Sequence, residues 1–383
     1  MDIRRWQADP SVQAALQHLA DVKTIGNTAI AIQQVPAPTF DEDRRGALVE
    51  ERLARLGLSD VERDTVGNVY GRRPGRADGA ALMLAAHIDT VFPLETDLAV
   101  RYEGDRIYGP GLGDNSLGVA GLLHLAQVFQ EYDLPNRGDI WFVGDVGEEG
   151  LGDLQGMRAA VARLRPHLGA VIALEGCDFG KLHHQAIGVR RYRIDVTAPG
   201  GHSWGDFGSP SAIHVLVRIA AQLTELSPSI DPRTTFNIGV ISGGTSVNTI
   251  AEEASLLLDM RSVEMNALNA LVRRVDVIIA AEAARHSRVR VSVKTVGNRP
   301  AGAIPRNHPL VQAATAAYRT SGALVSYVQS STDANIPLSE GIPAVCVGLT
   351  DGRNAHRQDE YILPANLGRG MQALLLLVLA ASE

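Results

Sequence analysis

The sequence predicts an α/β fold: a mixed, mostly parallel sheet flanked by helices, with an inserted α+β domain. Three apolar runs, at residues 81–86, 140–143 and 170–174, are continuous rather than alternating. Continuous runs are typical of strands that are buried on both faces of a parallel sheet. Helices are predicted to begin near Leu117 and near Leu154, between these runs. Strands and helices therefore alternate along the first half of the chain, as they do in α/β proteins.

A different pattern begins at Val189. Tyr192, Ile194 and Val196 alternate with charged residues, which is typical of a half-exposed antiparallel strand. The next elements are predicted as a helix, two strands, a helix and a strand, over residues 212–226, 234–242, 253–262, 265–285 and 289–296. This order is that of the ferredoxin-like split unit. We therefore expect an inserted domain over residues 189–298, between two parts of a catalytic domain, 1–188 and 299–383.

Three further elements are predicted outside the inserted domain. Thr39 and Glu42 match a capping box, which would open a helix that ends near Gly57. A helix at 308–320 precedes another continuous apolar run at 344–349. The apolar stretch 371–381 is shorter than the roughly 20 residues that cross a bilayer, so we expect a buried C-terminal helix.

Composition excludes several classes of function. The 383 residues carry a net charge of −7 and only 5% aromatic residues, and no Lys/Arg run stands out, which argues against nucleic-acid or membrane binding. The two cysteines, Cys177 and Cys346, have no metal or redox spacing and are predicted to be reduced thiols. The charged N-terminal stretch lacks the apolar core of a secretory signal. We therefore expect a cytoplasmic protein.

Five potential metal ligands lie at or just after the ends of apolar runs. These residues are His87, Asp114, Glu149, Glu175 and His356. Open α/β sheets bind ligands at the carboxyl ends of their strands. Two histidines and three carboxylates suit two zinc-like ions that share one carboxylate. Asp89, two residues after His87, would orient the imidazole. Glu148 would be a carboxylate that binds no metal and takes a proton from water.

Each of these signals has an ordinary alternative when it is taken alone. His87 and Asp89 would form a buried ion pair, and Asp114 would cap the helix that follows its glycine-rich loop. That loop lacks the Lys-Ser/Thr of a phosphate-binding loop, and no G-x-G-x-x-G opens the first strand–helix turn. Glu148 and Glu149 would be solvated charges. The recurrence of ligand-type residues beyond several strand ends favours the metal site.

The ordered motifs HIDTV, GPGLGDNSLG, VGEEG, ALEG and NAHRQDE resemble those of the co-catalytic zinc metallopeptidase and deacylase family. This family includes glutamate carboxypeptidase, peptidase T, aminoacylase, acetylornithine deacetylase and succinyl-diaminopimelate desuccinylase. The resemblance covers nearly the whole chain and implies a zinc-exopeptidase-like catalytic domain with an inserted lid. It also implies that Asp114 bridges two ions, that His87 and Glu175 complete one site, and that Glu149 and His356 complete the other. Glu148 would be the general base.

The resemblance extends to the inserted domain. Its Gly200-Gly201-His202-Ser203 motif is similar to that of the family's lid histidine, which helps to hold the oxyanion of its own or a neighbouring subunit's site. Asn248 and Arg261 match lid positions associated with substrate binding, including a free carboxylate. The alternatives are a surface histidine in a glycine turn and a structural ion-pair partner at a strand end.

The expected function is metal-dependent hydrolysis of an amide or peptide bond in a small, carboxylate-bearing substrate, such as a di- or tripeptide. The main alternative is an N-acyl-amino-acid deacylase. A catalytically silent binding protein is disfavoured because all five ligands and Glu148 are present. Zn²⁺ is the expected ion, although the same ligands accept Co²⁺ or Mn²⁺. No nucleic-acid or membrane partner is expected. A homodimer that forms through the lid domain is a possible assembly.

Overall fold

The computed structural model describes residues 3–383, without the side chains of Arg4 and Gln7. The chain forms two compact units. The first unit extends to Ala186 and resumes at Ala303, and the second comprises Ile187–Gly302. Each unit has its own hydrophobic core, so each is described by itself.

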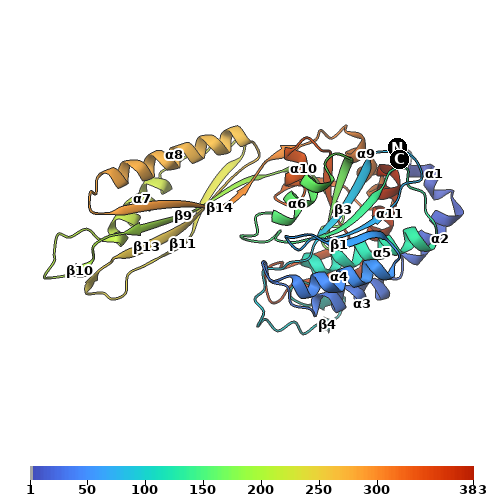
Figure 1. The fold of residues 1–383 in the computed structure, drawn as a ribbon, viewed down its shortest axis with the longest axis horizontal. Helices are drawn as coiled ribbons and strands as arrows, with labels where there is room; N and C mark the ends of the chain where they lie inside the picture. The colour runs from blue at the N-terminus through green and yellow to red at the C-terminus, as the bar shows by residue number, and fades with distance from the viewer. Residues whose placement is uncertain (1–2) are drawn as a thin grey trace. The chain divides into compact units, whose positions relative to one another are not determined.

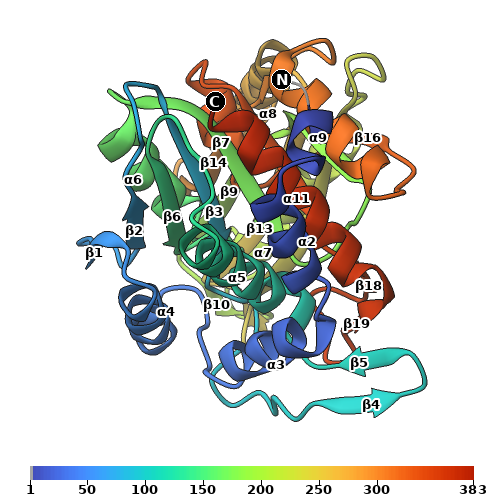
Figure 2. The same cartoon turned by 90° about the vertical axis from the view of Figure 1, so that its right-hand side faces the viewer.

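The described part of the first unit holds a nine-stranded sheet (Figures 1 and 2). Its strands lie in the order β1 (Ser59–Arg63), β2 (Val69–Arg73), β6 (Ile140–Asp145), β3 (Ala81–His87), β7 (Leu168–Glu175), β17 (Ala344–Gly348), β8 (Lys181–Ala186) and β15 (Gly302–Ala303), with β16 (Ser326–Ser330) also paired to β8. The central strands β6, β3, β7 and β17 are parallel, whereas β1 and β2 pair antiparallel with their neighbours. Strand β8 pairs antiparallel with β17 and parallel with β16. The predicted mixed, mostly parallel sheet is confirmed.

Helices cover both faces of this sheet, as Figure 2 shows. On β3, Leu82 and Leu84 pack in one core and Met83 and Ala85 in another, because successive side chains point to opposite faces. The first core takes in α1 (Ile3–Gln7), α2 (Pro10–His18), α3 (Val22–Gln33), α4 (Asp43–Arg55), α5 (Leu117–Glu131), α9 (Pro309–Thr320) and α11 (Leu367–Ala381). The second takes in α6 (Gln155–Leu164) and α10 (Asn335–Ser339). The helices predicted near Leu117, near Leu154 and at 308–320 are confirmed.

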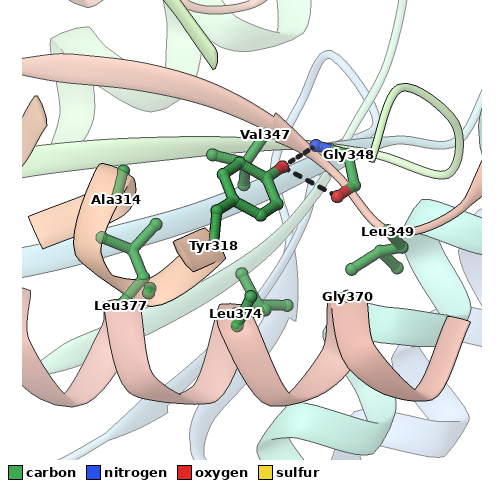
Figure 3. Close-up of a pocket in the computed structure, with 10 residues that line it drawn as sticks. Ala314, Tyr318, Val347, Gly348, Leu349, Gly370, Leu374 and Leu377 are labelled. Carbon is green, nitrogen blue, oxygen red and sulfur yellow. Dashed lines mark hydrogen bonds between the residues drawn. The ribbon is translucent and has the colours of Figure 1, made fainter. Parts of the chain in front are cut away.

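The C-terminal helix packs against the end of β17 (Figure 3). Tyr318 of α9 is buried, and its hydroxyl donates to the carbonyl of Gly348 and accepts from its N–H, both at 2.8 Å. A side chain at Gly370 would collide with the backbone of Leu349, so only glycine allows α11 to approach this closely. These contacts fix the point from which the chain runs on toward His356.

Two expectations about helices need correction. Together with η2 (Pro364–Asn366), the C-terminal helical segment has 18 residues, so by length and composition it could cross a membrane. Most of α11 is nevertheless buried in the core, as predicted. The capping box is wrong: α4 begins at Asp43, and no side chain caps it. The hydroxyl of Thr39 instead donates to Asp89 at 2.9 Å, because that buried carboxylate needs donors.

A second, small sheet of the first unit was not predicted. Its strands are β18 (Asp351–Arg353), β19 (Tyr361–Leu363), β5 (Arg106–Tyr108) and β4 (Arg101–Glu103), all antiparallel. The pairing of β19 with β5 brings the loop that carries His356 beside the glycine-rich segment that carries Asp114. Residues about 250 positions apart in the sequence are joined in this way.

The second unit has a four-stranded antiparallel sheet in the order β11 (Thr234–Gly243), β13 (Glu253–Ser262), β9 (Gly188–Thr197) and β14 (Arg290–Arg299). Helices α7 (Ala212–Thr224) and α8 (Met265–Ala284) pack on one face, against the alternate residues Tyr192, Ile194 and Val196 (Figure 1). The predicted ferredoxin-like order is confirmed. A short extra pair, β10 (Gly201–His202) with β12 (Thr249–Ile250), was not predicted.

Candidate metal centre and second-unit site residues

The carboxyl ends of the parallel strands carry three of the five predicted ligands. His87 is the last residue of β3, Glu175 is the last residue of β7, and Glu149 follows the end of β6 by four residues. The other two come from outside the large sheet. Asp114 lies in the short helical turn η1 (Leu112–Ser116), and His356 lies in the loop between β18 and β19.

The structure brings these five side chains together in two groups that share one member. The Nε2 atom of His87 is 3.3 Å from Oδ1 of Asp114 and 3.8 Å from Oε2 of Glu175. The Nε2 atom of His356 is 3.1 Å from Oδ2 of Asp114 and 3.0 Å from Oε1 of Glu149. In each group the donor atoms lie within 4.8 Å of one another, close enough to hold one metal ion. Asp114 presents a different oxygen to each group.

The charges in the two groups fit the binding of cations. Burial and the negative charges of Asp114 and Glu149 raise the pKa of Glu175, although His87 opposes this shift. Hydrogen bonds to Asp114 and Glu149 raise the pKa of His356 to about 10. Burial alone would lower the pKa of His87, but the hydrogen bonds to its carboxylate neighbours raise it well above its usual range. Divalent cations would relieve this crowding of carboxylates and displace the protons of the imidazoles.

Asp89 connects the first group to Glu148 and Glu149. Its buried carboxylate accepts the backbone N–H groups of Glu148 and Glu149, each at 3.0 Å. Oδ1 of Asp89 lies 3.4 Å from Nδ1 of His87, which also contacts the Asp89 carbonyl oxygen at 3.2 Å. A carbonyl oxygen only accepts, so this contact assigns the ring proton to Nδ1 and leaves Nε2 free to bind a cation. Glu148 itself is buried at this turn.

Two buried residues beside the site were not singled out from the sequence. Arg45 of α4 donates to the carbonyls of Val35 and Ile88, and so holds the backbone between His87 and Asp89. Glu360 accepts N–H groups from the segment that carries Asp114. Arg45 gives no signal in the sequence because it stands among other charges of an amphipathic helix. Glu360 lies inside the NAHRQDE motif, but the motif gives no sign of its contacts with the segment that carries Asp114.

The remaining predicted residues lie in the second unit. His202 is exposed, and its Nδ1 accepts the backbone N–H groups of Trp204 and Gly205, each at 3.2 Å. Because Nδ1 accepts, the neutral ring carries its proton on Nε2. His202 pairs with Thr249, which follows Asn248. The backbone carbonyl of Asn248 accepts the N–H of Ser203 at 3.0 Å, so His202 and Asn248 belong to one local structure.

Arg261 lies near the end of β13 and forms an ion pair on its own strand. Its Nε donates to Asp259 at 2.7 Å, and Asp259 also accepts from Nε of Arg191 at 2.9 Å. Burial alone would raise the pKa of Asp259, but these two guanidinium groups lower it. Arg261 is therefore a structural ion-pair partner. It also remains partly exposed, with N–H donors on the guanidinium that Asp259 does not use.

Comparison with protein families matches residues 83–380 to the model described as peptidase family M20/M25/M40. Among curated proteins, carboxypeptidase G2 of Pseudomonas sp. (strain RS-16) is 26% identical over 98% of this chain and 90% of its own length. Succinyl-diaminopimelate desuccinylase of Corynebacterium glutamicum is 27% identical over 85% of this chain and 88% of its own length. The matches include both peptidases and deacylases.

Solved structures share the fold of this chain. A tripeptidase from Staphylococcus aureus superposes with a TM-score of 0.80 at 23% identity, over 94% of this chain and 99% of its own. The YXEP protein of Bacillus subtilis is described as a dinuclear metal binding peptidase. It superposes with a TM-score of 0.67 at 17% identity, over 96% of this chain and 98% of its own. At these identities the likeness concerns the fold. The predicted mixed, mostly parallel sheet flanked by helices matches the fold of these structures.

Proposed function

Because this chain belongs to peptidase family M20/M25/M40, and is thus a metal-dependent hydrolase of the peptidase or deacylase type, we propose that it cleaves the amide bond of a small, carboxylate-bearing substrate. A di- or tripeptide, or the C-terminal residue of a short peptide, is the proposed substrate. The observation that supports this function most directly is the geometry of Asp114. Its two carboxylate oxygens face two separate groups of ligand-type side chains.

The proposed centre holds two divalent ions, most readily Zn²⁺, with Co²⁺ or Mn²⁺ as alternatives that the same donors accept. His87, Asp114 and Glu175 would hold one ion, and Asp114, Glu149 and His356 the other. When bound, such a pair of ions would supply Lewis-acid chemistry that lowers the pKa of water and polarises a carbonyl group. Three protein donors per ion leave positions for water and substrate.

Glu148 is the proposed general base. Its carboxylate belongs to neither group of ligands, and its backbone is held beside Glu149 by Asp89. A carboxylate at this point takes the proton from the attacking water and delivers it to the departing amine. Asp89 is assigned a positioning role in this proposal, since it orients both His87 and the turn that carries Glu148.

His202 is the proposed oxyanion donor of the second unit, which would act as a lid. The proton on Nε2 makes this ring a donor, and a donor is what a developing negative charge requires. Asn248 is proposed to bind substrate from the adjoining strand. The free N–H groups of Arg261 are proposed to bind the substrate carboxylate, for which a guanidinium is well shaped.

A deacylase is the second candidate, and the similarity to a desuccinylase over 85% of the chain favours it. An N-acyl amino acid presents the same amide bond and the same free carboxylate as a peptide. The two candidates therefore use one centre and differ in the acyl group on the carbonyl side of the scissile bond.

Two broader features are also proposed. The edge strand β11 exposes Val240 and Ile241, and α7 exposes Ile213 and Val217, so a homodimer would form through the second unit. Cys177 and Cys346 are both free thiols, which suits the reducing environment of the cytoplasm.

The experiment that tests the function is a substrate panel. Zinc-loaded protein is assayed with di- and tripeptides and with N-acetyl and N-succinyl amino acids, each with a free or an amidated carboxylate. We expect hydrolysis of the free acids, with a much lower kcat/KM for the amidated forms, and loss of activity with a chelator. Turnover that survives complete metal removal would contradict the proposal. Preference for peptides or for acyl amino acids decides between the two candidates.

A further inference from the structure

The glycine-rich segment that carries Asp114 wraps around the side chain of Glu360. Oε2 of Glu360 accepts the N–H of Gly111 at 2.7 Å, and Oε1 accepts the N–H groups of Gly113 at 2.7 Å and of Asp114 at 2.9 Å. Glu360 is only 1% exposed. Successive backbone N–H groups that point toward one spot form a concave anion-binding site. Here a side chain of the same chain fills it.

The local backbone is built for this contact. Gly111 has a φ of +70°, which side-chain-bearing residues rarely adopt. A Cβ atom at Gly113 would lie 3.0 Å from Oε1 of Glu360 and 2.7 Å from Sγ of Cys177, so glycine is needed for the carboxylate to approach. The glycines of the GPGLGD motif are therefore explained by an internal carboxylate, without any bound phosphate.

Glu360 also belongs to the loop that carries His356, because it stands four residues after that histidine. Its own carbonyl accepts the N–H of Gly109 at 3.0 Å, and Tyr361, the next residue, pairs with Tyr108. The backbone and the side chain of Glu360 thus join the two segments on which Asp114 and His356 lie.

We propose that Glu360 is a positioning residue that sets the place of Asp114 relative to His356, and so determines the affinity of the two-ion centre. This inference rests on the proposed function, since it assumes that the centre binds metal. Glu360 touches neither substrate nor ion in this proposal. Residues that orient metal ligands typically change metal affinity by about 10–100-fold when they are replaced.

The test is titration of metal-free protein with Co²⁺, followed by calorimetry and by the visible absorption spectrum of the bound ion. The spectrum reports the coordination geometry, which a loss of overall stability does not alter. Glu360→Gln keeps the shape of the side chain but places an NH₂ group against one of the three N–H donors. We expect about 10–100-fold weaker binding of at least one Co²⁺ and a changed spectrum, with the circular dichroism of the wild type.

Two further variants separate position from charge. Glu360→Asp keeps the charge but is one methylene shorter, and we expect it to weaken Co²⁺ binding as well. Asp359→Asn removes a charge from the neighbouring residue, whose carboxylate bonds to Arg357 and Asn354 within the same loop, and we expect wild-type binding. If Glu360→Gln does not fold, Glu360→Asp decides.

The inference would be overturned if Glu360→Gln bound Co²⁺ with the affinity and spectrum of the wild type. It would also be overturned if Glu360→Gln bound Co²⁺ weakly while Glu360→Asp bound it normally, because the charge at residue 360 would then matter and its position would not. Equal weakening in Asp359→Asn would also overturn it, because charge alone would then explain the effect. A wild-type protein that binds fewer than two Co²⁺ ions would instead remove the proposed function on which the inference rests. The two failures are therefore distinguishable.

Discussion

At the scale of single residues, the proposed chemistry depends on a division of labour among neighbouring carboxylates. Asp114 and Glu149 face imidazole nitrogens, Asp89 is saturated by backbone and side-chain donors, and Glu148 belongs to neither metal group. A carboxylate that binds an ion, or that orients other groups as Asp89 does, cannot also serve as the base. We therefore assign proton transfer to Glu148 in the proposed mechanism.

The first prediction concerns Glu148. Glu148→Gln should keep both metal ions and the fold, and should lower kcat by several orders of magnitude, because the amide cannot accept the proton of water. Metal analysis and kcat measurement on the same sample check this. A metal-loaded variant with a near-normal kcat would show that another group is the base.

The second prediction concerns the shared ligand. Asp114→Asn should lose most of the bound metal, since an amide replaces the only charge common to both groups. In the wild type, zinc should raise the unfolding temperature and a chelator should reverse this, because a ligand that binds only the folded state stabilises it. The variant should show little response to zinc. Two tightly bound ions in Asp114→Asn would mean that Asp114 is not the bridge.

The sequence sufficed to find residues that stand in recognisable motifs, but not those that act through the backbone. His87, Asp114, Glu149, Glu175 and His356 were singled out because ligand-type residues follow apolar runs, and the structure gathers them into two groups. The three N–H contacts of Glu360 depend on the pairing of β19 with β5. Such long-range register cannot be deduced from local pattern, so the role of Glu360 could not be predicted.

At the scale of elements, helix α5 shows how burial shapes pH behaviour away from the metal centre. His124 is buried on this helix, and its Nε2 lies 3.0 Å from the hydroxyl of Thr28. Burial, with smaller contributions from His18 and Arg52, lowers the pKa of His124 to about 4. The folded protein therefore keeps this imidazole neutral at pH values where the unfolded chain protonates it.

The third prediction follows from this shift. Between an unfolded-state pKa of about 6.5 and a folded-state pKa of about 4, the unfolded chain binds more protons, so this contribution to stability is lost as the pH falls through that window. The unfolding free energy should therefore decrease less between these two pH values in His124→Leu than in the wild type, by on the order of 2 kcal/mol. Chemical unfolding at several pH values measures it, with the exposed His167→Gln as a control. An unchanged pH slope in His124→Leu would refute the assignment.

Elements with a strong pattern were predictable, and short ones were not. The buried strands β3, β6, β7 and β17 were recognised from continuous apolar runs, and β9 from its alternation. The small sheet was missed because each of its strands has only three residues, mostly exposed or half-buried. The capping box at Thr39 failed because a tertiary hydrogen bond to Asp89 took the hydroxyl.

At the scale of the whole molecule, the second unit supplies the proposed lid and dimer surface. Its sheet has two edge strands, β11 and β14, and unpaired edges are ready to pair with another chain. Exposed apolar side chains lie on β11 at Val240 and Ile241, which are 51% and 54% exposed. The adjacent helix α7 adds Ile213 and Val217, so this edge is the one proposed to meet its copy.

The fourth prediction is about oligomeric state. The wild type should be a dimer by light scattering after gel filtration, and Ile241→Lys should be a monomer because a buried charge opposes pairing at this edge. Val293→Lys, on the opposite edge strand β14, is the matched control and should stay dimeric. A monomeric wild type, or dissociation by the control alone, would contradict a dimer through β11.

We propose that residues from the first quarter of the chain to its last tenth converge on a centre for two divalent ions. Equilibrium dialysis of metal-free protein against Zn²⁺, followed by elemental analysis, tests this most directly. We expect two equivalents of zinc per chain in the wild type, and markedly fewer in Asp114→Asn than in the surface control Asp359→Asn. A wild-type protein that retains no zinc would contradict it.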